Sequence, residues 1–193
     1  MRALVACEYS GRVREAFRAR GHDAWSCDLL PSDDNSPHHI QGDALQLIGG
    51  GQQWDLLIAH PPCTYLAVSG LHWNKRTPGR AEKTEQALQF VQSLLDAPID
   101  RIALENPVSC ISTRIRKPDQ IIQPWQFGHD ASKKTCLWLK NMQPLKPTDV
   151  IIKDRYSNQT ASGQNKLPPS KDRWKLRSTT YQGIADAMAE QWG

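Results

Sequence analysis

The stretch from Asp55 to Gly70, DLLIAHPPCTYLAVSG, places a cysteine directly behind two prolines at the end of an apolar run. A cysteine attacks as its thiolate, which forms more readily beside cations or a helix N-terminus. Pro61 and Pro62 restrict the backbone before Cys63, so the direction of the thiol is set before any ligand arrives. Cys63 is therefore a candidate nucleophile. The alternative is a small apolar side chain in a structural loop.

A second candidate is the carboxyl group of Glu105, which follows the apolar run IAL and precedes Asn106 and Pro107. A carboxyl at the edge of an apolar site has a raised pKa and can hold a proton near neutral pH. A thiolate nucleophile and a proton-donating carboxyl would form a functional pair. Without Cys63 on the same side of the fold, a solvent-facing glutamate would be the simpler interpretation.

Three further polar segments stand near predicted strand ends. The turn at Ser10 and Gly11 opens a helical pattern, whose first backbone N–H groups could bind a carboxylate or phosphate. Asp28 lies at the tip of the second apolar run, where an acidic residue commonly accepts hydrogen bonds from ribose hydroxyls. Asp43 precedes the third run and could instead cap a turn. These residues suggest a nucleoside-containing cofactor, and the first turn has neither the G-x-G-x-x-G nor the P-loop pattern.

The elements that must position these groups alternate between strands and helices. Strands are predicted at 2–6, 23–30, 54–59 and 100–107, with helices between Gly11 and Gly21 and over 81–97. This alternation predicts an α/β fold with a doubly wound, mostly parallel sheet. Ligands of such sheets bind beyond the carboxyl ends of the strands, so the candidate groups should share one rim.

The second half of the chain is less regular. A strand is predicted at 135–140, mostly loop at 141–178, and a closing helix in which Ile184, Ala187 and Met188 face the core. The polar stretch 31–42 is also predicted as loop. Its two adjacent histidines have no further ligands at suitable spacing, so no metal site is predicted.

Composition narrows the class of protein. The 193 residues suffice for one domain with a real core, and no apolar run approaches the roughly 20 residues that span a bilayer. The start, MRALVACEYS, lacks the apolar stretch of a secretory signal, so we expect a cytoplasmic protein without membrane partners. The five cysteines include no Cys-x-x-Cys pair, which indicates reduced thiols.

Charge is distributed unevenly along the chain. Residues 1–109 contain ten Lys and Arg against thirteen Asp and Glu, whereas residues 110–193 contain fourteen against seven. A basic half suits a polyanion such as nucleic acid, although an ordinary solvated surface would look the same. Within it, KDRWKLR joins an aromatic ring that could stack on a base to several cations. The candidate contacts there are Arg173, Trp174, Lys175 and Arg177.

In their order and spacing, these motifs resemble the DNA cytosine-5 methyltransferase family over about residues 3–110, especially its small phage and prophage members. ACEYSGRVREAFRARGHD resembles the family's cofactor loop, PPCTYLAVSG its Pro-Cys motif, and ENP its Glu-Asn-Val motif. YQGIADAMAEQW resembles its closing helix more weakly. The resemblance implies S-adenosyl-L-methionine as the cofactor, held by Glu8, Tyr9, Ser10, Gly11, Asp28, Asp43, Pro61 and Pro62.

The resemblance also implies a mechanism. Cys63 would add to C6 of cytosine while Glu105 donates a hydrogen bond or proton at N3, which makes C5 reactive toward the methyl group. Asn106 would hold the cysteine loop and Glu105 in register. Because the target atoms lie inside the base stack, the base must be flipped out or already single-stranded.

The chain departs from the family pattern at several places. Thr64 and Ala67 replace a usual Gln and Ser, although Ser69 and Gly70 fit as substrate contacts. The Gln-x-Arg-x-Arg element is absent, and we consider Lys133 and Lys134 as substitutes. The target-recognition domain is missing or reduced, which places sequence specificity in question. A second copy of the chain or a separate protein could supply it.

These features divide the chain into three parts. Residues 1–140 would form the catalytic and cofactor-binding domain, and 141–178 a short basic segment that could be a reduced recognition region. Residues 179–193 would form a helix that packs back on the first part.

Two alternatives remain. The same chemistry could modify a free pyrimidine nucleotide such as dCMP, since a missing recognition domain suits a small substrate. A non-catalytic module could also keep the fold and bind nucleic acid or cofactor without turnover.

Overall fold

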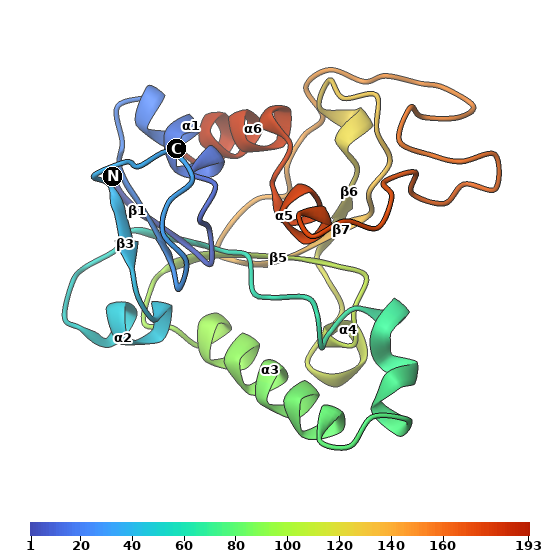
Figure 1. The fold of residues 1–193 in the computed structure, drawn as a ribbon. Helices are drawn as coiled ribbons and strands as arrows, with labels where there is room; N and C mark the ends of the chain where they lie inside the picture. Colours follow the sequence, from blue (N-terminus) through green and yellow to red (C-terminus); the bar gives the residue numbers. More distant parts are fainter.

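The computed structural model describes residues 1–193, which form one seven-stranded sheet in the order β3-β2-β1-β4-β5-β7-β6 (Figure 1). The strands are β1 (Arg2–Ala6), β2 (Asp23–Asp28), β3 (His39–Gln41), β4 (Leu56–Ala59), β5 (Arg101–Pro107), β6 (Gln120–Ile122) and β7 (Thr135–Lys140). β1 to β5 pair in parallel, whereas β7 runs antiparallel to both β5 and β6. The predicted α/β fold with a mostly parallel sheet is confirmed.

The central strand β4 and all but the first residue of β1 are apolar, because both faces of the sheet are covered. Successive residues of a strand point to opposite faces. Along β1, Ala3 and Val5 belong to one buried cluster and Leu4 and Ala6 to the other. All four side chains are fully buried, which is the pattern expected for a parallel sheet between two layers of helices.

The helices form those two layers, so the sheet is doubly wound (Figure 1). α1 (Arg12–Ala19) and α6 (Gln182–Trp192) cover one face, and α2 (Ala44–Gly49), α3 (Arg80–Leu95) and α4 (Ile111–Arg114) lie on the other. α6 packs against α1, and its Ile184, Ala187 and Met188 are buried. The end of the chain therefore covers the helix that follows the first strand.

Three short helices connect the larger elements: η1 (Val68–Lys75), η2 (Pro124–Gln126) and α5 (Arg173–Ser178). The segment 141–172 contains no helix or strand, in agreement with the predicted loop. The loop prediction is wrong at α5, which contains the basic sequence RWKLRS. None of the helices is both long and apolar enough to cross a bilayer.

The predicted loop at 31–42 is also wrong at its end, where His39 to Gln41 form β3 beside β2. The ring of His39 is occupied by structural hydrogen bonds. Its Nδ1 lies 2.9 Å from the Ser26 hydroxyl and its Nε2 2.9 Å from the Leu30 carbonyl oxygen. This histidine thus ties the edge strand to its neighbour.

Candidate active site

The candidate site lies where the strand order changes direction, beyond the carboxyl ends of β1 and β4. Glu8 follows β1, His60 follows β4, and Glu105 lies near the end of β5. The imidazole of His60 lies close enough to act electrostatically on both carboxyl groups. Burial, the largest effect, leaves the pKa of Glu8 raised, whereas at Glu105 the contacts with His60 and Lys133 outweigh burial and the pKa is lowered. These three side chains therefore form one electrostatic group on the rim that the sequence predicted.

The cysteine loop is held from two sides. The Asn106 side-chain amide donates a hydrogen bond to the Pro61 carbonyl oxygen at 2.8 Å, and the side chain is 1% exposed. On the other side, the Arg80 guanidinium donates to the Thr64 carbonyl oxygen at 2.9 Å. Asn106 thus connects the end of β5 to the two prolines, while Cys63 remains solvent-exposed between these anchors.

Backbone pairing joins the same two segments further along. Val68 donates to the Val108 carbonyl oxygen at 3.2 Å, and Cys110 donates to the Leu66 carbonyl oxygen at 2.9 Å. The residues after Cys63 and the residues after Glu105 therefore form one connected unit.

The thiol of Cys63 is surrounded by charges of both signs. Although the residue is exposed, neighbouring groups partly desolvate its sulfur; this desolvation is the first cause of its raised pKa, and the negative charge of Glu105 is the second. Lys133 and Arg177 act in the opposite direction. The thiol is therefore protonated at rest near neutral pH, and two cations are placed to favour the thiolate.

The expectation of a raised pKa at Glu105 is wrong. Burial raises the pKa of this carboxyl, but the hydrogen bond from His60 and the charges of Lys133 and His60 outweigh it, and the pKa is lowered. The Glu105 side chain is 15% exposed, and its Oε2 lies 3.1 Å from Nδ1 of His60. Glu105 is thus a carboxylate in the free protein.

The cofactor side of the rim begins with Glu8. Its carboxylate accepts hydrogen bonds from the backbone N–H groups of Val13 at 2.7 Å and Arg14 at 3.2 Å. The N–H groups of Val13 and Arg14 at the start of α1 are therefore already occupied by a carboxyl group of the protein itself, whose pKa is raised by burial. Gly11 has φ of 72°, and a Cβ there would overlap the buried Arg14 guanidinium, so this turn requires glycine.

Asp28 and Asp43 both lie near Cys7: burial is the main cause of the raised pKa of the Cys7 thiol, and the charges of the two aspartates add to it. Asp28 accepts from the Leu30 N–H at 2.9 Å, and burial raises its pKa. Asp43 caps α2 by accepting from the Leu45 N–H at 2.7 Å. This side of the rim therefore presents carboxyl oxygens that can accept hydrogen bonds from a ligand.

The short helix α5 lies over this side of the site. The Tyr9 hydroxyl is 2.9 Å from the Ser178 hydroxyl, and the Tyr9 and Trp174 ring centroids are 5.7 Å apart. The Lys175 ammonium lies 3.7 Å from a carboxylate oxygen of Asp33, on the loop after β2. The basic C-terminal segment thus reaches the predicted cofactor loop.

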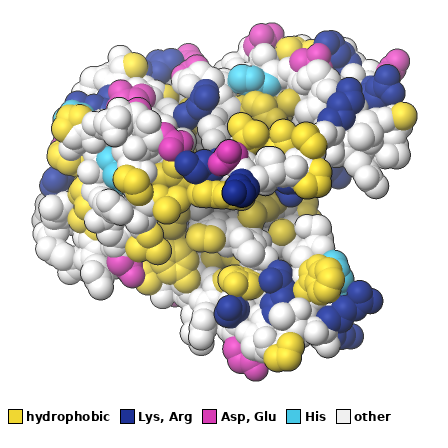
Figure 2. Space-filling model, in the orientation of Figure 1, with side chains coloured by type: hydrophobic (Ala, Val, Ile, Leu, Met, Phe, Trp, Pro, Cys, Tyr) yellow, Lys and Arg dark blue, Asp and Glu magenta, His cyan; other side chains and the backbone are white.

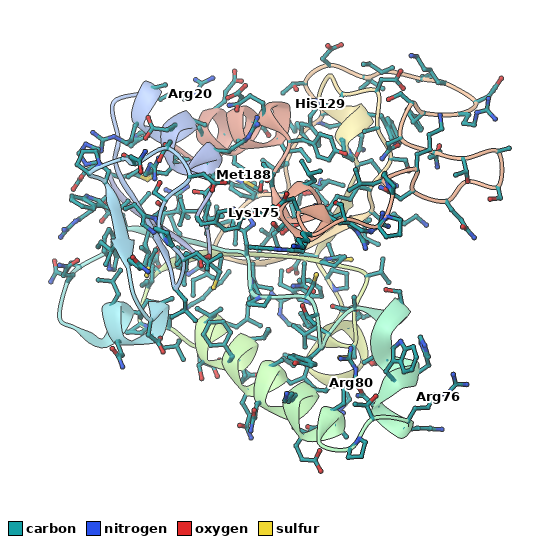
Figure 3. The ribbon with its side chains drawn as sticks, viewed as in Figure 1. Arg20, Arg76, Arg80, His129, Lys175 and Met188 are labelled. Carbon is teal, nitrogen blue, oxygen red and sulfur yellow. The ribbon has the colours of Figure 1, made fainter.

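A notch opens beside this cover, between the part of the molecule that carries α5 and the projection formed by η1 and the start of α3 (Figures 1 and 2). Arg76 and Arg80 lie on the projection, whereas Lys175 lies on α5 across from them (Figure 3). Ser69 and Gly70 belong to η1, and a Cβ on Gly70 would approach the Arg80 guanidinium to 3.1 Å. The notch therefore has basic side chains on both sides.

The two lysines proposed as substitutes differ in position. The Lys133 ammonium donates to the Arg177 carbonyl oxygen at 2.9 Å and influences both Cys63 and Glu105. Lys134 is exposed and acts instead on the buried Cys136. The structure therefore brings Lys133, but not Lys134, to the thiol.

Sequence reasoning missed two residues of the site, His60 and Arg80. His60 stands directly before the Pro-Pro-Cys motif, and that adjacency is a signal that could have identified it. Arg80 lies 16 residues from its partner Thr64, and nothing in the sequence links the two.

No model of a known protein family matches the sequence, and no curated protein matches it either. Among solved structures, the chain is similar to a candidate DNA modification methyltransferase encoded within an E. coli prophage. The two superpose with a TM-score of 0.50 at 12% sequence identity, over 78% of this chain and 52% of that one. The chain thus spans about half the length of that protein.

At this identity the similarity shows the fold alone. The seven-stranded sheet, with its antiparallel β7 and helices on both faces, is the fold that the two proteins share. Within this fold, the molecule has a carboxylate-lined side at β1 and β2 and a thiol side at β4 and β5.

Proposed function

We propose that the protein transfers a methyl group from S-adenosyl-L-methionine to C5 of cytosine in DNA, through a covalent bond between Cys63 and C6. The observation that carries the proposal is the junction of the thiol and carboxyl segments. Asn106, next to Glu105 in sequence, donates directly to the backbone before Cys63. A nucleophile and an acid–base group are thereby held on one rigid support.

The cofactor side supports this choice. S-adenosyl-L-methionine carries ribose hydroxyls and positive charge, and when bound it supplies an electrophilic methyl group. Asp28 can accept from the hydroxyls, and Glu8 and Asp43 contribute negative charge around the site. The walls of this cofactor site would be formed by Tyr9, Ser10, Gly11, Pro61 and Pro62.

On the thiol side, Cys63 first loses its thiol proton to water. The thiolate sulfur then bonds to C6 and the ring electrons move toward C5, while N3 receives a proton by way of Glu105. The activated C5 then gains a methyl group and loses its own proton to water. The C6–S bond breaks, N3 gives up its proton, and Cys63 leaves as a thiolate. Lys133 and Arg177 favour the thiolate at both ends of this cycle.

DNA as substrate is supported by the basic notch and by the described class of the similar prophage protein. We assign 1–140 to catalysis and cofactor binding, and 179–193 to a helix that completes this part. The basic segment 141–178, with Arg173 and Trp174 at its end, would contact DNA with Ser69 and Gly70 across the notch. Recognition of a sequence would then need a second copy or a partner.

The test combines transfer and trapping. Purified protein is incubated with methyl-labelled S-adenosyl-L-methionine and duplex DNA, single-stranded DNA or dCMP, and with the same DNA containing 5-fluorocytosine. We expect labelled DNA and an adduct stable to denaturation, both lost in Cys63→Ser and kept in the matched control Cys110→Ser. If only dCMP were methylated, the substrate would be a free nucleotide and not DNA. If neither an adduct nor methyl transfer were found, the protein would be a non-catalytic binding module.

A further inference from the structure

We propose that His60 is a positioning residue that stores the proton which Glu105 delivers to N3 of the base. This inference rests on the function proposed above. It assigns a task to a side chain that Cys63, Glu105 and Asn106 leave unexplained.

The geometry places the imidazole against the carboxyl. Nδ1 of His60 lies 3.1 Å from Oε2 of Glu105, and the two side chains are 9% and 15% exposed. The backbone N–H of His60 donates to the Ala6 carbonyl oxygen at 2.9 Å, at the seam between β1 and β4. The ring therefore stands on the sheet itself, and its position does not depend on a mobile loop.

The second ring nitrogen is the more informative atom. Nε2 of His60 is buried and has no hydrogen-bond partner, an arrangement that costs stability in a ring kept only for packing. Glu8 lies close enough for the imidazole charge to lower the pKa of its carboxyl, although burial, the larger effect, raises it. The ring thus contacts the carboxyl group of Glu105 and lies within electrostatic range of the buried Glu8.

Charged and polar groups from several elements act on His60 and Glu105. Glu105 faces His60 from β5 and Glu8 from the turn after β1, and Arg14 on α1 in turn faces Glu8. Lys133, before β7, and the Thr135 hydroxyl lower the pKa of Glu105 together with His60, against the effect of burial. In the free protein Glu105 is therefore ionised, and it has no proton of its own to give.

Imidazole is the side chain that ordinarily exchanges a proton near neutral pH. When a cytosine arrives, the proton on Nδ1 passes to the Glu105 carboxyl and from it to N3, as the sulfur of Cys63 bonds to C6. The imidazolium becomes neutral, Glu105 ends as a carboxylate, and the base carries the proton. When sulfur leaves C6, the N3 proton returns by the same route.

The test uses His60→Asn, whose side-chain amide can still donate to Glu105 but cannot titrate. Without the stored proton, transfer requires Glu105 itself to be protonated, which becomes rarer as pH rises. We expect kcat for transfer to DNA to fall about 100-fold at pH 7.5 and less than about tenfold at pH 5.5. KM for DNA and cofactor should not change. His22→Asn, directly before β2 at the amino-terminal end of the strands, is the control.

A His60→Asn protein with the wild-type pH profile would overturn the proposal, because the ring would then serve only as a hydrogen-bond donor. Failure of the wild type itself to transfer or form an adduct would be a different result, and it would overturn the proposed function. A further measurement does not depend on this variant folding. The imidazole N–H resonance of His60 in the otherwise unchanged protein should shift in Glu105→Gln, and an unshifted resonance would contradict the pairing.

Discussion

The two sides of the rim differ in the charges they carry and in how many of their polar atoms already have a hydrogen-bond partner. On the side of β1 and β2, Glu8 and Asp43 accept hydrogen bonds from the first N–H groups of α1 and α2. On the side of β4 and β5, His60 and Asn106 each retain a buried polar atom without a partner. The first side presents carboxyl groups that are anchored by backbone N–H groups, and the second contains both signs of charge and buried polar atoms without a partner.

This difference indicates how the two sides would act. Carboxylates already held by helix N-termini are rigid and can orient a ligand without rearranging. A thiol, an imidazole and a carboxyl among cations can exchange protons as a reaction proceeds. Changes on the first side should therefore alter ligand affinity, and changes on the second should alter reactivity.

The largest expected effect concerns helix α5 (Arg173–Ser178), which lies over the side of β1 and β2. Trp174 is 50% exposed on α5, where its ring could stack on a base. Trp174→Ala should weaken binding of a single-stranded oligonucleotide by about tenfold to 100-fold, measured by fluorescence anisotropy. Ile121→Ala, which also removes an exposed apolar side chain but on the edge strand β6, is the control. Equal affinity of the two variants for the oligonucleotide would show that Trp174 does not contact nucleic acid.

A smaller effect is expected on the carboxylate side. Asp28→Asn removes a charged acceptor and should weaken S-adenosyl-L-methionine binding by about tenfold, measured by calorimetry. Asp23→Asn, at the other end of the same strand, should leave affinity unchanged. The alkylation rate of Cys63 should be the same in both variants. A changed rate in Asp28→Asn would mean that the carboxyl side influences the thiol side.

The smallest effect concerns the thiol side alone. Because the pKa of Cys63 is raised, first by burial and then by the Glu105 charge, its alkylation by iodoacetamide should accelerate from pH 7 to 9. Glu105→Gln should speed alkylation and Lys133→Gln should slow it, each by less than about tenfold. Mass spectrometry can follow Cys63 against the buried Cys110. If both variants changed the alkylation rate in the same direction, Glu105 and Lys133 would not have opposite effects on the thiol.

The sequence was sufficient for the central sheet and for the thiol. The runs at β1, β4 and β5 are unmistakable because burial on both faces demands continuous apolar residues. β3 and α5 were missed because three and six residues carry too little periodicity. Those short elements depend on tertiary partners, β2 for the strand and Tyr9 for the helix.

The site was predicted less completely than the fold. Glu105 was placed correctly at a buried strand end, but the sign of its pKa shift depends on His60, which lies 45 residues away in sequence. The cofactor and DNA contacts stay predictions, and Asp43 shows why they need testing. Its side chain has a structural task as the cap of α2, which would keep an aspartate there even without a ligand.

The hydrogen bond between the Tyr9 and Ser178 hydroxyls has a thermodynamic consequence. Tyr9 belongs to the loop that follows β1, while Ser178 ends the helix α5 that faces the notch. A molecule that displaces α5 must also break this link, and thereby changes the free energy of any ligand held by the loop. Linkage makes any such effect reciprocal: a ligand that binds at the loop and a molecule that displaces α5 must change each other's affinity by the same factor.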